Sequence, residues 1–128
     1  MLQKIENYHH AVAQLEQAVT VYSRDPDDAL YRDGLIQRFE FTVELAWKSL
    51  REYLEDQGSV LAVVSPRAVL KEAYAAGVIQ DAEVWDAVIR SRNITSHVYD
   101  EQTAIDVAAH ICGQYLPVLQ KLDAFYRE

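Results

Sequence analysis

The 128-residue sequence has few of the residues that make tight turns and cross-links: four Gly, three Pro and one cysteine, Cys112. So few Gly and Pro exclude a many-stranded β-sandwich or barrel, in which turns recur every few residues. One cysteine cannot form an internal disulfide or a cysteine-rich zinc site, and a lone thiol is typical of a reducing compartment. These shortages favour a helical domain in the cytoplasm.

The chain also lacks a long apolar run and an excess of positive charge. No basic stretch followed by an uninterrupted apolar one occurs at the amino end, and no segment is apolar over a bilayer-spanning length. We therefore expect neither secretion nor membrane insertion. Twenty acidic and twelve basic residues give a net charge of -8, which should repel nucleic acid overall. Any RNA contact would depend on local charge or on a partner protein.

What the sequence has is an ordinary globular composition: half of its residues are hydrophobic and a quarter are charged. The length suits a single domain, residues 1–128. Two Trp and eight Tyr are many for so small a protein, and some of them could serve an interface rather than the core. A homodimer is therefore a reasonable expectation.

Apolar residues recur at helical spacing through most of the chain. We predict helices over residues 5–22 and 28–57, a short one from Ser65-Pro66 to Gly77, one after Asp81, and a long one from Asp100 that Pro117 should kink. The β-branched run SVLAVVS, residues 59–65, could be a strand by periodicity alone, but it has no evident second strand and is expected to be a loop. The predicted fold is all-α, an antiparallel up-and-down bundle of about five helices.

The densest group of reactive side chains is RSRNITSHVYD, residues 90–100, at the end of the fourth predicted helix. At about 100° per residue, Arg92 follows Val88 and Ile89 on the apolar face, whereas Arg90 points to solvent. A guanidinium on an apolar face is costly unless it is paired or has a task. Arg92 is therefore the more informative arginine.

His97 lies five residues beyond Arg92, about 140° round an ideal helix, so the two side chains diverge if the helix continues. They converge only if the helix ends or unwinds between them. Asn93, Thr95 and Ser96 are poor interior helix residues, which makes such an ending credible.

If these side chains converge, an imidazole could take a proton from a hydroxyl near pH 7 while a guanidinium holds a phosphate. That combination suits metal-free RNA cleavage, in which the ribose 2′-hydroxyl attacks its own phosphate, and a second copy in a dimer would supply both an acid and a base. In the alternative, structural interpretation, Arg92 pairs with Glu44 or Glu40, while His97 and Tyr99 finish one helix and begin the next. Spacing alone does not decide between them.

Two stretches carry a resemblance to a known family. The string RNITSHVYDE resembles the Arg-x4-His-x-Tyr motif of HEPN proteins, specifically the helical subunit paired with minimal nucleotidyltransferases, called HepT or nucleotidyltransferase substrate-binding protein. The stretch YRDGLIQRFEFTVELAWKSL is similar to the second helix of that group, with matching residues at Gln37, Arg38, Phe39, Glu40, Glu44, Trp47 and Lys48. The similarity covers nearly the whole chain, including Ser65-Pro66-Arg67 and the helix that contains Trp85.

This resemblance implies a dimeric helical bundle in which Arg92 and His97 are ribonuclease residues supported by Asn93. In toxin members of the family, a partner nucleotidyltransferase adds AMP to the tyrosine that matches Tyr99. A nucleotide two residues from His97 would bring negative charge and bulk that keep RNA out. Other members are described only as substrate-binding partners, so a non-enzymatic subunit that presents a substrate or nucleotide to the nucleotidyltransferase stays open.

Further candidates lie on the second predicted helix. Trp47 and Lys48 could line a groove that faces RNA or the nucleotidyltransferase, since an aromatic plane beside a cation suits a nucleotide. The resemblance adds Arg38 and Glu44 to this substrate- or partner-binding set. In the plainer interpretation Trp47 belongs to the core and Lys48 to the solvated surface.

No cofactor and no metal site are expected. Adjacent residues on a helix point about 100° apart, so His9 and His10 cannot easily face one ion. Glu40 and Glu44 share the spacing of di-iron bundles, but no Glu-x-x-His follows on another helix. A surface position or an ion pair is the better expectation for these two carboxylates.

Overall fold

The computed structural model describes residues 3–97 and 100–128, and every regular element in that part of the chain is a helix. The elements are α1 (Gln3–Arg24), α2 (Ala29–Asp56), α3 (Pro66–Ala75), α4 (Ala82–His97), α5 (Glu101–His110), the π-helix η1 (Ile111–Tyr115) and α6 (Leu116–Tyr126). Because α5, η1 and α6 follow one another without a break, they form one rod. The predicted bundle of five helical segments is thereby confirmed.

The helices begin and end where the capping residues predict. The carboxylate of Asp28 accepts a hydrogen bond of 2.9 Å from the amide of Tyr31 at the start of α2. The hydroxyl of Ser65 accepts one of 3.2 Å from the amide of Ala68, with proline in the first turn of α3. Gly58 and Gly77 follow α2 and α3 with positive φ angles of 97° and 77°, a conformation that glycine adopts without strain.

Helix α4 begins directly after Asp81, as predicted. The φ angle of Asp81 is 56°, and its backbone carbonyl accepts hydrogen bonds from the amides of Val84 and Trp85. The carboxylate faces Lys121 of α6, with 3.7 Å between the carboxylate oxygen and Nζ. This residue therefore ties the start of α4 to the last helix.

The last rod departs from regular α-helix just before Pro117. In η1 the backbone widens to a π-helix, and the amide of Leu116 donates to the carbonyl of Ile111, five residues back. Pro117 has no N–H and its ring crowds the preceding turn, so an ideal α-helix cannot continue through it. A wider turn is one way in which helices accommodate such a position. The sequence predicts the location of the irregularity but not its π form.

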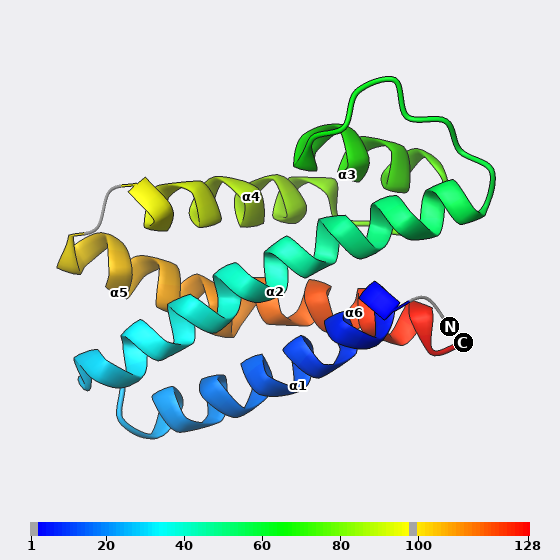
Figure 1. Cartoon of the computed structure of the whole chain (residues 1–128). Coiled ribbons are helices and arrows are strands. Elements are labelled where there is room, and N and C mark those ends of the chain that lie inside the picture. Colours follow the sequence, from blue (N-terminus) through cyan, green and yellow to red (C-terminus); the bar gives the residue numbers. More distant parts are fainter. Residues whose placement is uncertain (1–2, 98–99) are drawn as a thin grey trace.

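The helices lie side by side around one core, with α1 and α2 as a long antiparallel pair and the α5–η1–α6 rod packed behind them (Figure 1). Helix α4 lies along α2, and α3 packs on both. Each rod contributes large side chains that are almost completely buried: Tyr8, Leu15, Leu35, Phe39, Leu50, Val88, Ile111 and Leu119. Burial of one such side chain contributes roughly 1.5–3 kcal/mol to the free energy of folding, so these apolar rows determine how the helices pack.

Three buried tyrosine hydroxyls are paired within this core. Tyr8 donates to the carbonyl of Leu119 at 2.7 Å, joining α1 to α6. The hydroxyls of Ser49 and Tyr126 lie 2.8 Å apart, and those of Ser91 and Tyr115 lie 2.7 Å apart. These pairs satisfy polar groups that would otherwise be costly to bury, and the last of them fixes α4 against η1.

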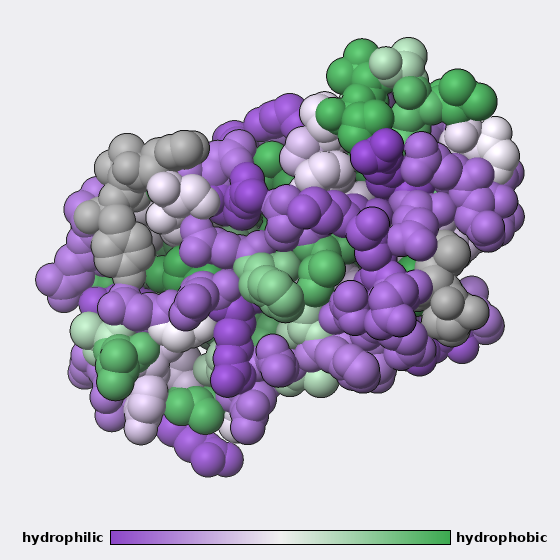
Figure 2. Space-filling model, in the orientation of Figure 1, coloured by the Kyte–Doolittle hydropathy of each residue, from purple (hydrophilic) through white to green (hydrophobic). Residues whose placement is uncertain are grey.

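Residues 59–65 form a loop, as predicted, with neither helix nor strand assigned to them. Leu61 packs against the core, whereas Val60, Val63 and Val64 are exposed. Figure 2 shows an apolar patch where this loop and α3 lie, on a face that is otherwise mostly hydrophilic. Within residues 3–97 and 100–128, no helix has both the length and the apolar character needed to cross a membrane.

Candidate functional site

The candidate site lies where α2 and α4 run side by side. Nη2 of Arg92 on α4 is 2.6 Å from Oε2 of Glu44 on α2. Both side chains are about one-third exposed, at 32% and 31%, so the ion pair sits at the edge of the core rather than within it. The structural alternative for Arg92, a pair with a carboxylate of the second helix, is therefore present in the structure.

The choice between the two neighbouring arginines is also confirmed. The side chain of Arg90 is 61% exposed, and its Nε forms an ion pair of 3.2 Å with Asp86 on the same helix. Arg92 continues the buried row of Val88 and Ile89 toward α2. Helical phase thus placed Arg92 correctly on the inward side of α4.

A second carboxylate on α2 holds the last turns of α4. Oε2 of Glu40 accepts hydrogen bonds from the hydroxyls of Thr95, at 2.8 Å, and Ser96, at 3.0 Å. The same two hydroxyls also contact the backbone carbonyl of Arg92, at 3.2 Å and 2.9 Å. The sequence analysis considered Glu40 only as a partner of Arg92 and did not identify its bonds to Thr95 and Ser96.

The helix ending between Arg92 and His97 that their convergence would require is absent: α4 continues through His97. Thr95 and Ser96 are accommodated because their hydroxyls bond to the preceding turn and to Glu40, which offsets their low helix propensity. Residues 92 and 97 therefore stand about 140° apart round a continuous helix. The backbone of α4 therefore directs these two positions to different sides of the helix.

Trp47 and Lys48 join the same cluster through Glu44. The indole Nε1 of Trp47 donates to Oε2 of Glu44 at 3.2 Å, and Nζ of Lys48 lies 3.2 Å from the other carboxylate oxygen. The lysine nitrogen also sits 5.9 Å from the centre of the Trp47 ring. Trp47 is half-buried, with its ring packed against the core and its N–H directed to the site. Trp47 is therefore neither wholly a core residue nor wholly a residue of an exposed groove.

The environment of Glu44 favours its charged form. Partial burial opposes ionisation, but hydrogen bonds from Trp47 and Lys48 and the positive charges of Arg92 and Lys48 outweigh it, so the pKa of Glu44 is lowered. Beside this carboxylate, a cavity of about 360 Å³ is lined by Lys4, Trp47, Lys48, Arg51, Glu52 and Glu55. The site therefore offers cations and an aromatic ring to a ligand, with acidic residues interspersed.

Arg38 does not join this cluster. Its Nη1 donates to the carbonyl of Gln14 at 2.8 Å and to the side chain of Gln17 at 3.3 Å, both on α1. It lies with Phe41 beside a shallow cavity of about 350 Å³ on the α1 side of α2. The structure thus separates Arg38 from Glu44, Trp47 and Lys48, with which the sequence had grouped it.

The remaining predicted residues lie at the end of α4. Asn93 is exposed, and its Oδ1 accepts a hydrogen bond of 3.3 Å from Nη1 of Arg92. His97 is the last residue of α4, but its side chain, like all of Tyr99, lies outside the described residues. Helix α5 begins at Glu101, where the carboxylate of Asp100 accepts a 2.8 Å hydrogen bond from the amide of Thr103.

One charged residue near this connection was not identified from the sequence. Arg32 on α2 is only 6% exposed, and its Nη2 lies 3.8 Å from Glu101 at the start of α5. Its spacing from Leu35 and Ile36, three and four residues, would have placed it on the buried face of α2. The same phase argument that identified Arg92 would therefore have found it.

The histidines of α1 show no metal-binding geometry. Nδ1 of His9 lies 2.9 Å from a carboxylate oxygen of Asp123, and the rings of His9 and His10 are 5.9 Å apart and tilted by 50°. In the part of the chain that the structure describes, no three His, Cys, Asp or Glu side chains gather as metal ligands would. His9 therefore hydrogen-bonds to Asp123 and joins α1 to α6.

Comparison with known proteins adds a family to this geometry. The family described as nucleotidyltransferase substrate binding protein like matches residues 3–128. The probable ribonuclease HepT of Haemophilus influenzae is 37% identical to this chain over 81 residues. That alignment covers 61% of this chain and 56% of the relative, so it spans little more than half of the relative's length.

Two solved structures share the whole bundle. A Haemophilus influenzae protein, described as having the fold of a substrate binding domain of a nucleotidyltransferase, is 29% identical with a TM-score of 0.84, over 97% of this chain and 99% of that one. A tri-AMPylated HEPN toxin of Shewanella oneidensis, solved in complex with its MNT antitoxin, has a TM-score of 0.78 over 99% and 98%, but its 17% identity supports likeness of fold alone. Since the family match covers nearly every residue, the chain belongs to the nucleotidyltransferase substrate binding protein like family.

Proposed function

We propose that this protein is the helical HEPN subunit of a two-component, toxin-antitoxin-like module and acts as a metal-independent endoribonuclease. Its partner is a separately encoded minimal nucleotidyltransferase. The observation that supports this most strongly is the position of Arg92, the arginine of the family motif, which Glu44 holds at 2.6 Å at the exposed edge between α2 and α4. There its guanidinium is both oriented by α2 and open to a phosphate from solvent.

In this proposal Arg92 binds the scissile phosphate, because a guanidinium offers two parallel donors to phosphate oxygens. His97 takes the proton from the ribose 2′-hydroxyl, whose oxygen then attacks the adjacent phosphorus. The bond to the 5′-oxygen breaks, that oxygen receives a proton from an acid, and a 2′,3′-cyclic phosphate remains. Asn93, which accepts a hydrogen bond from Arg92, steadies the guanidinium.

A homodimer supplies the second proton-transfer group. Because α4 is continuous through residue 97, positions 92 and 97 face different sides of the helix, and one chain need not form the whole site. Two copies across a shared cleft provide both an acid and a base. Leu30, Gly34 and Phe41 fall on one outer face of α2, where Leu30 is 77% and Phe41 58% exposed. Large apolar side chains in such a row are suited to contact with a second copy.

The deciding experiment is cleavage of RNA by the purified protein in the presence of a chelator. We expect the wild type to cleave and the Arg92→Ala and His97→Ala variants to lose about a hundredfold or more in rate. Arg90→Ala is the matched control, since this neighbouring cation points to solvent and pairs with Asp86. Equal rates for all three variants and the wild type would show that this site does not cleave RNA.

A second function is favoured by one observation: Arg92 is already paired, and its partner Glu44 is shared with Trp47 and Lys48. Such a cluster suits a non-enzymatic subunit that holds a nucleotide or substrate for the nucleotidyltransferase, with Arg92 recognising phosphate. Protein that is free of both its partner and AMP yet does not cleave RNA, while Arg92→Ala weakens nucleotide binding, would favour this function over the nuclease.

A further inference from the structure

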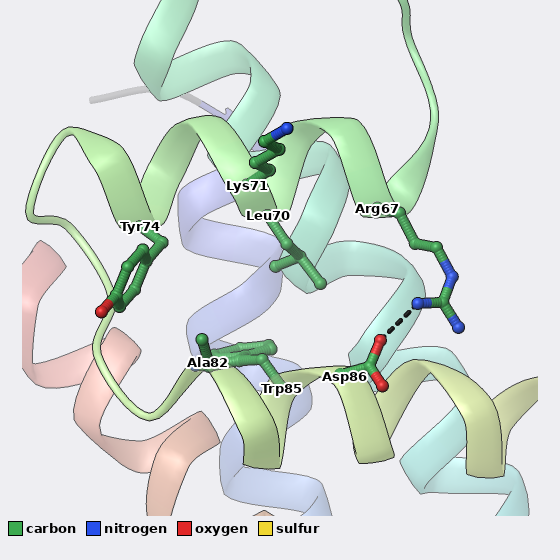
Figure 3. Close-up of a pocket in the computed structure, with 7 residues that line it drawn as sticks. All are labelled: Arg67, Leu70, Lys71, Tyr74, Ala82, Trp85 and Asp86. Atoms are coloured by element: carbon green, nitrogen blue, oxygen red, sulfur yellow. Dashed lines mark hydrogen bonds and ion pairs between the residues drawn. The ribbon is translucent and has the colours of Figure 1, made fainter.

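A separate cleft lies between α3 and α4, outside the Arg92 cluster. It has a volume of about 230 Å³ and is lined by Arg67, Leu70, Lys71, Tyr74, Ala82, Trp85 and Asp86. Figure 3 shows Leu70 of α3 facing Trp85 and Ala82 of α4 across it, with Tyr74 at one end and Arg67 at the other. Leu70 and Trp85 are only 7% and 3% exposed, so the floor is a fixed, apolar part of the core.

The rim on α3 combines two cations with an aromatic ring. Arg67, Lys71 and Tyr74 are spaced four and three residues apart, which places them on one face of the helix. Tyr74 is 55% exposed, so its ring is accessible to a ligand. In a chain with a net charge of -8, two cations and a tyrosine in one row form a local surface for an anion that carries a flat ring.

Asp86, the acidic residue of the cleft, does not prevent an anion from binding there. Asp86 pairs with Arg67 and also with Arg90, whose Nε lies 3.2 Å away. All three side chains are well exposed, and exposed ion pairs contribute little and are readily exchanged. A phosphate could therefore take the place of Asp86 at Arg67, since charge-assisted bonds to phosphate are stronger and can be bidentate.

We propose that this cleft binds one nucleotide unit, with its base against Leu70, Trp85 and Tyr74 and its phosphate at Arg67 and Lys71. A cleft of about 230 Å³ suits a single flat base, with its sugar and phosphate at the rim, rather than a folded peptide segment. Stacking on an exposed aromatic ring beside cations is how proteins bind unpaired bases without sequence preference.

The nucleotide has two possible sources that share this chemistry, a free mononucleotide and a residue of single-stranded RNA. Asp86 precedes Arg92 by six residues, about 9 Å along the axis of α4. The two positions also lie about 120° apart round the helix, so an RNA strand that reaches both sites has to pass part of the way round α4. The cleft itself does not depend on the proposed nuclease, because none of the residues that line it belongs to the Arg92 cluster.

The test is a titration of the folded protein, with chelator present, with AMP in one arm and a ten-nucleotide single-stranded RNA in the other. Binding is followed by amide chemical shifts in NMR spectra, and cleavage is prevented by the Arg92→Ala background. We expect shifts in α3 and the first turns of α4, and about tenfold or greater weakening in Lys71→Glu and Tyr74→Ala. Both side chains are exposed, so neither variant should disturb folding, which helical content by circular dichroism will check.

Matched controls are Arg24→Glu and Tyr31→Ala, an exposed cation and an exposed tyrosine elsewhere, which should bind as the background protein does. Binding of both ligands, or of either one alone, that weakens in Lys71→Glu and Tyr74→Ala supports the cleft, and the arm that responds identifies the source. The proposal is overturned if neither ligand binds, or if binding is indifferent to both substitutions. Either overturning result leaves the proposed function intact, because that function is tested by RNA cleavage in protein that retains Arg92.

Discussion

The guanidinium of Arg92 and the carboxylate of Glu44 meet at 2.6 Å although 48 residues separate them in the chain. The contact joins α4 to α2 at the edge of the core. It also neutralises the positive charge of Arg92, the arginine of the family motif. Glu44 therefore has two effects on Arg92. It fixes the direction of the guanidinium, and it competes with any phosphate for the same donors.

The substitution Glu44→Gln removes the charge of this carboxylate and so measures how much the ion pair contributes to protein stability. We expect it to lower the free energy of unfolding at pH 7 by less than about 1 kcal/mol, since a partly exposed ion pair is screened by solvent. Because the pKa of Glu44 is lowered in the folded state, its contribution is complete above the ordinary value of 4.5 and is lost as pH falls through the lowered pKa. Urea unfolding from pH 7 to pH 3 should thus show the difference between variant and wild type shrinking toward zero. A difference independent of pH would contradict this account.

The paired hydroxyls of Ser91 and Tyr115 fix α4 against η1, and their coupling can be measured. Tyr115→Phe and Ser91→Ala each leave one buried hydroxyl without its partner, which we expect to cost about 1–3 kcal/mol in the free energy of unfolding. The double variant should cost less than the sum, because no unpaired hydroxyl remains. A double-mutant cycle from denaturant unfolding measures this coupling, and strictly additive effects would show that the 2.7 Å contact carries no coupling energy.

Helical phase predicted more of this site than motif spacing did. The apolar rows gave the buried faces of the long helices and distinguished Arg92 from Arg90. Glu44 and Glu40 came only from the structural interpretation, as possible partners of Arg92, and both contact α4. The sequence could not show that Arg38 turns to α1, because phase tells which face of a helix is inward but not which neighbour covers it. For the same reason the sequence alone indicates that Thr95 and Ser96 can end the helix, although Glu40 binds their hydroxyls and holds both residues within α4.

The start of α5 should depend on Asp100, the residue that follows Tyr99. Its pKa is lowered by hydrogen bonds from the backbone amide and the hydroxyl of Thr103, so the cap is complete above the ordinary value of 3.8 and weakens as pH falls below it. We expect Asp100→Ala to speed hydrogen exchange at the amide of Thr103, and Asp100→Asn to preserve most of its protection. Asp28→Ala, which removes the equivalent cap of α2, is the control and should affect Tyr31 instead. Unchanged exchange at Thr103 in Asp100→Ala would exclude this capping role.

The last prediction concerns Tyr99, for which modification by the partner is the expectation carried by the family motif. When the protein is produced together with an active minimal nucleotidyltransferase and ATP, we expect mass spectrometry to find AMP joined through a phosphodiester to the hydroxyl of Tyr99. Tyr99→Phe should abolish the modification, whereas Tyr74→Phe, which changes an exposed tyrosine on α3, should not. The added charge and bulk two residues from His97 should then block RNA cleavage, because a phosphate at the site repels the substrate phosphate. Full cleavage by completely modified protein, or an unmodified Tyr99 beside an active partner, would contradict silencing by AMP and leave the nuclease to be controlled in another way.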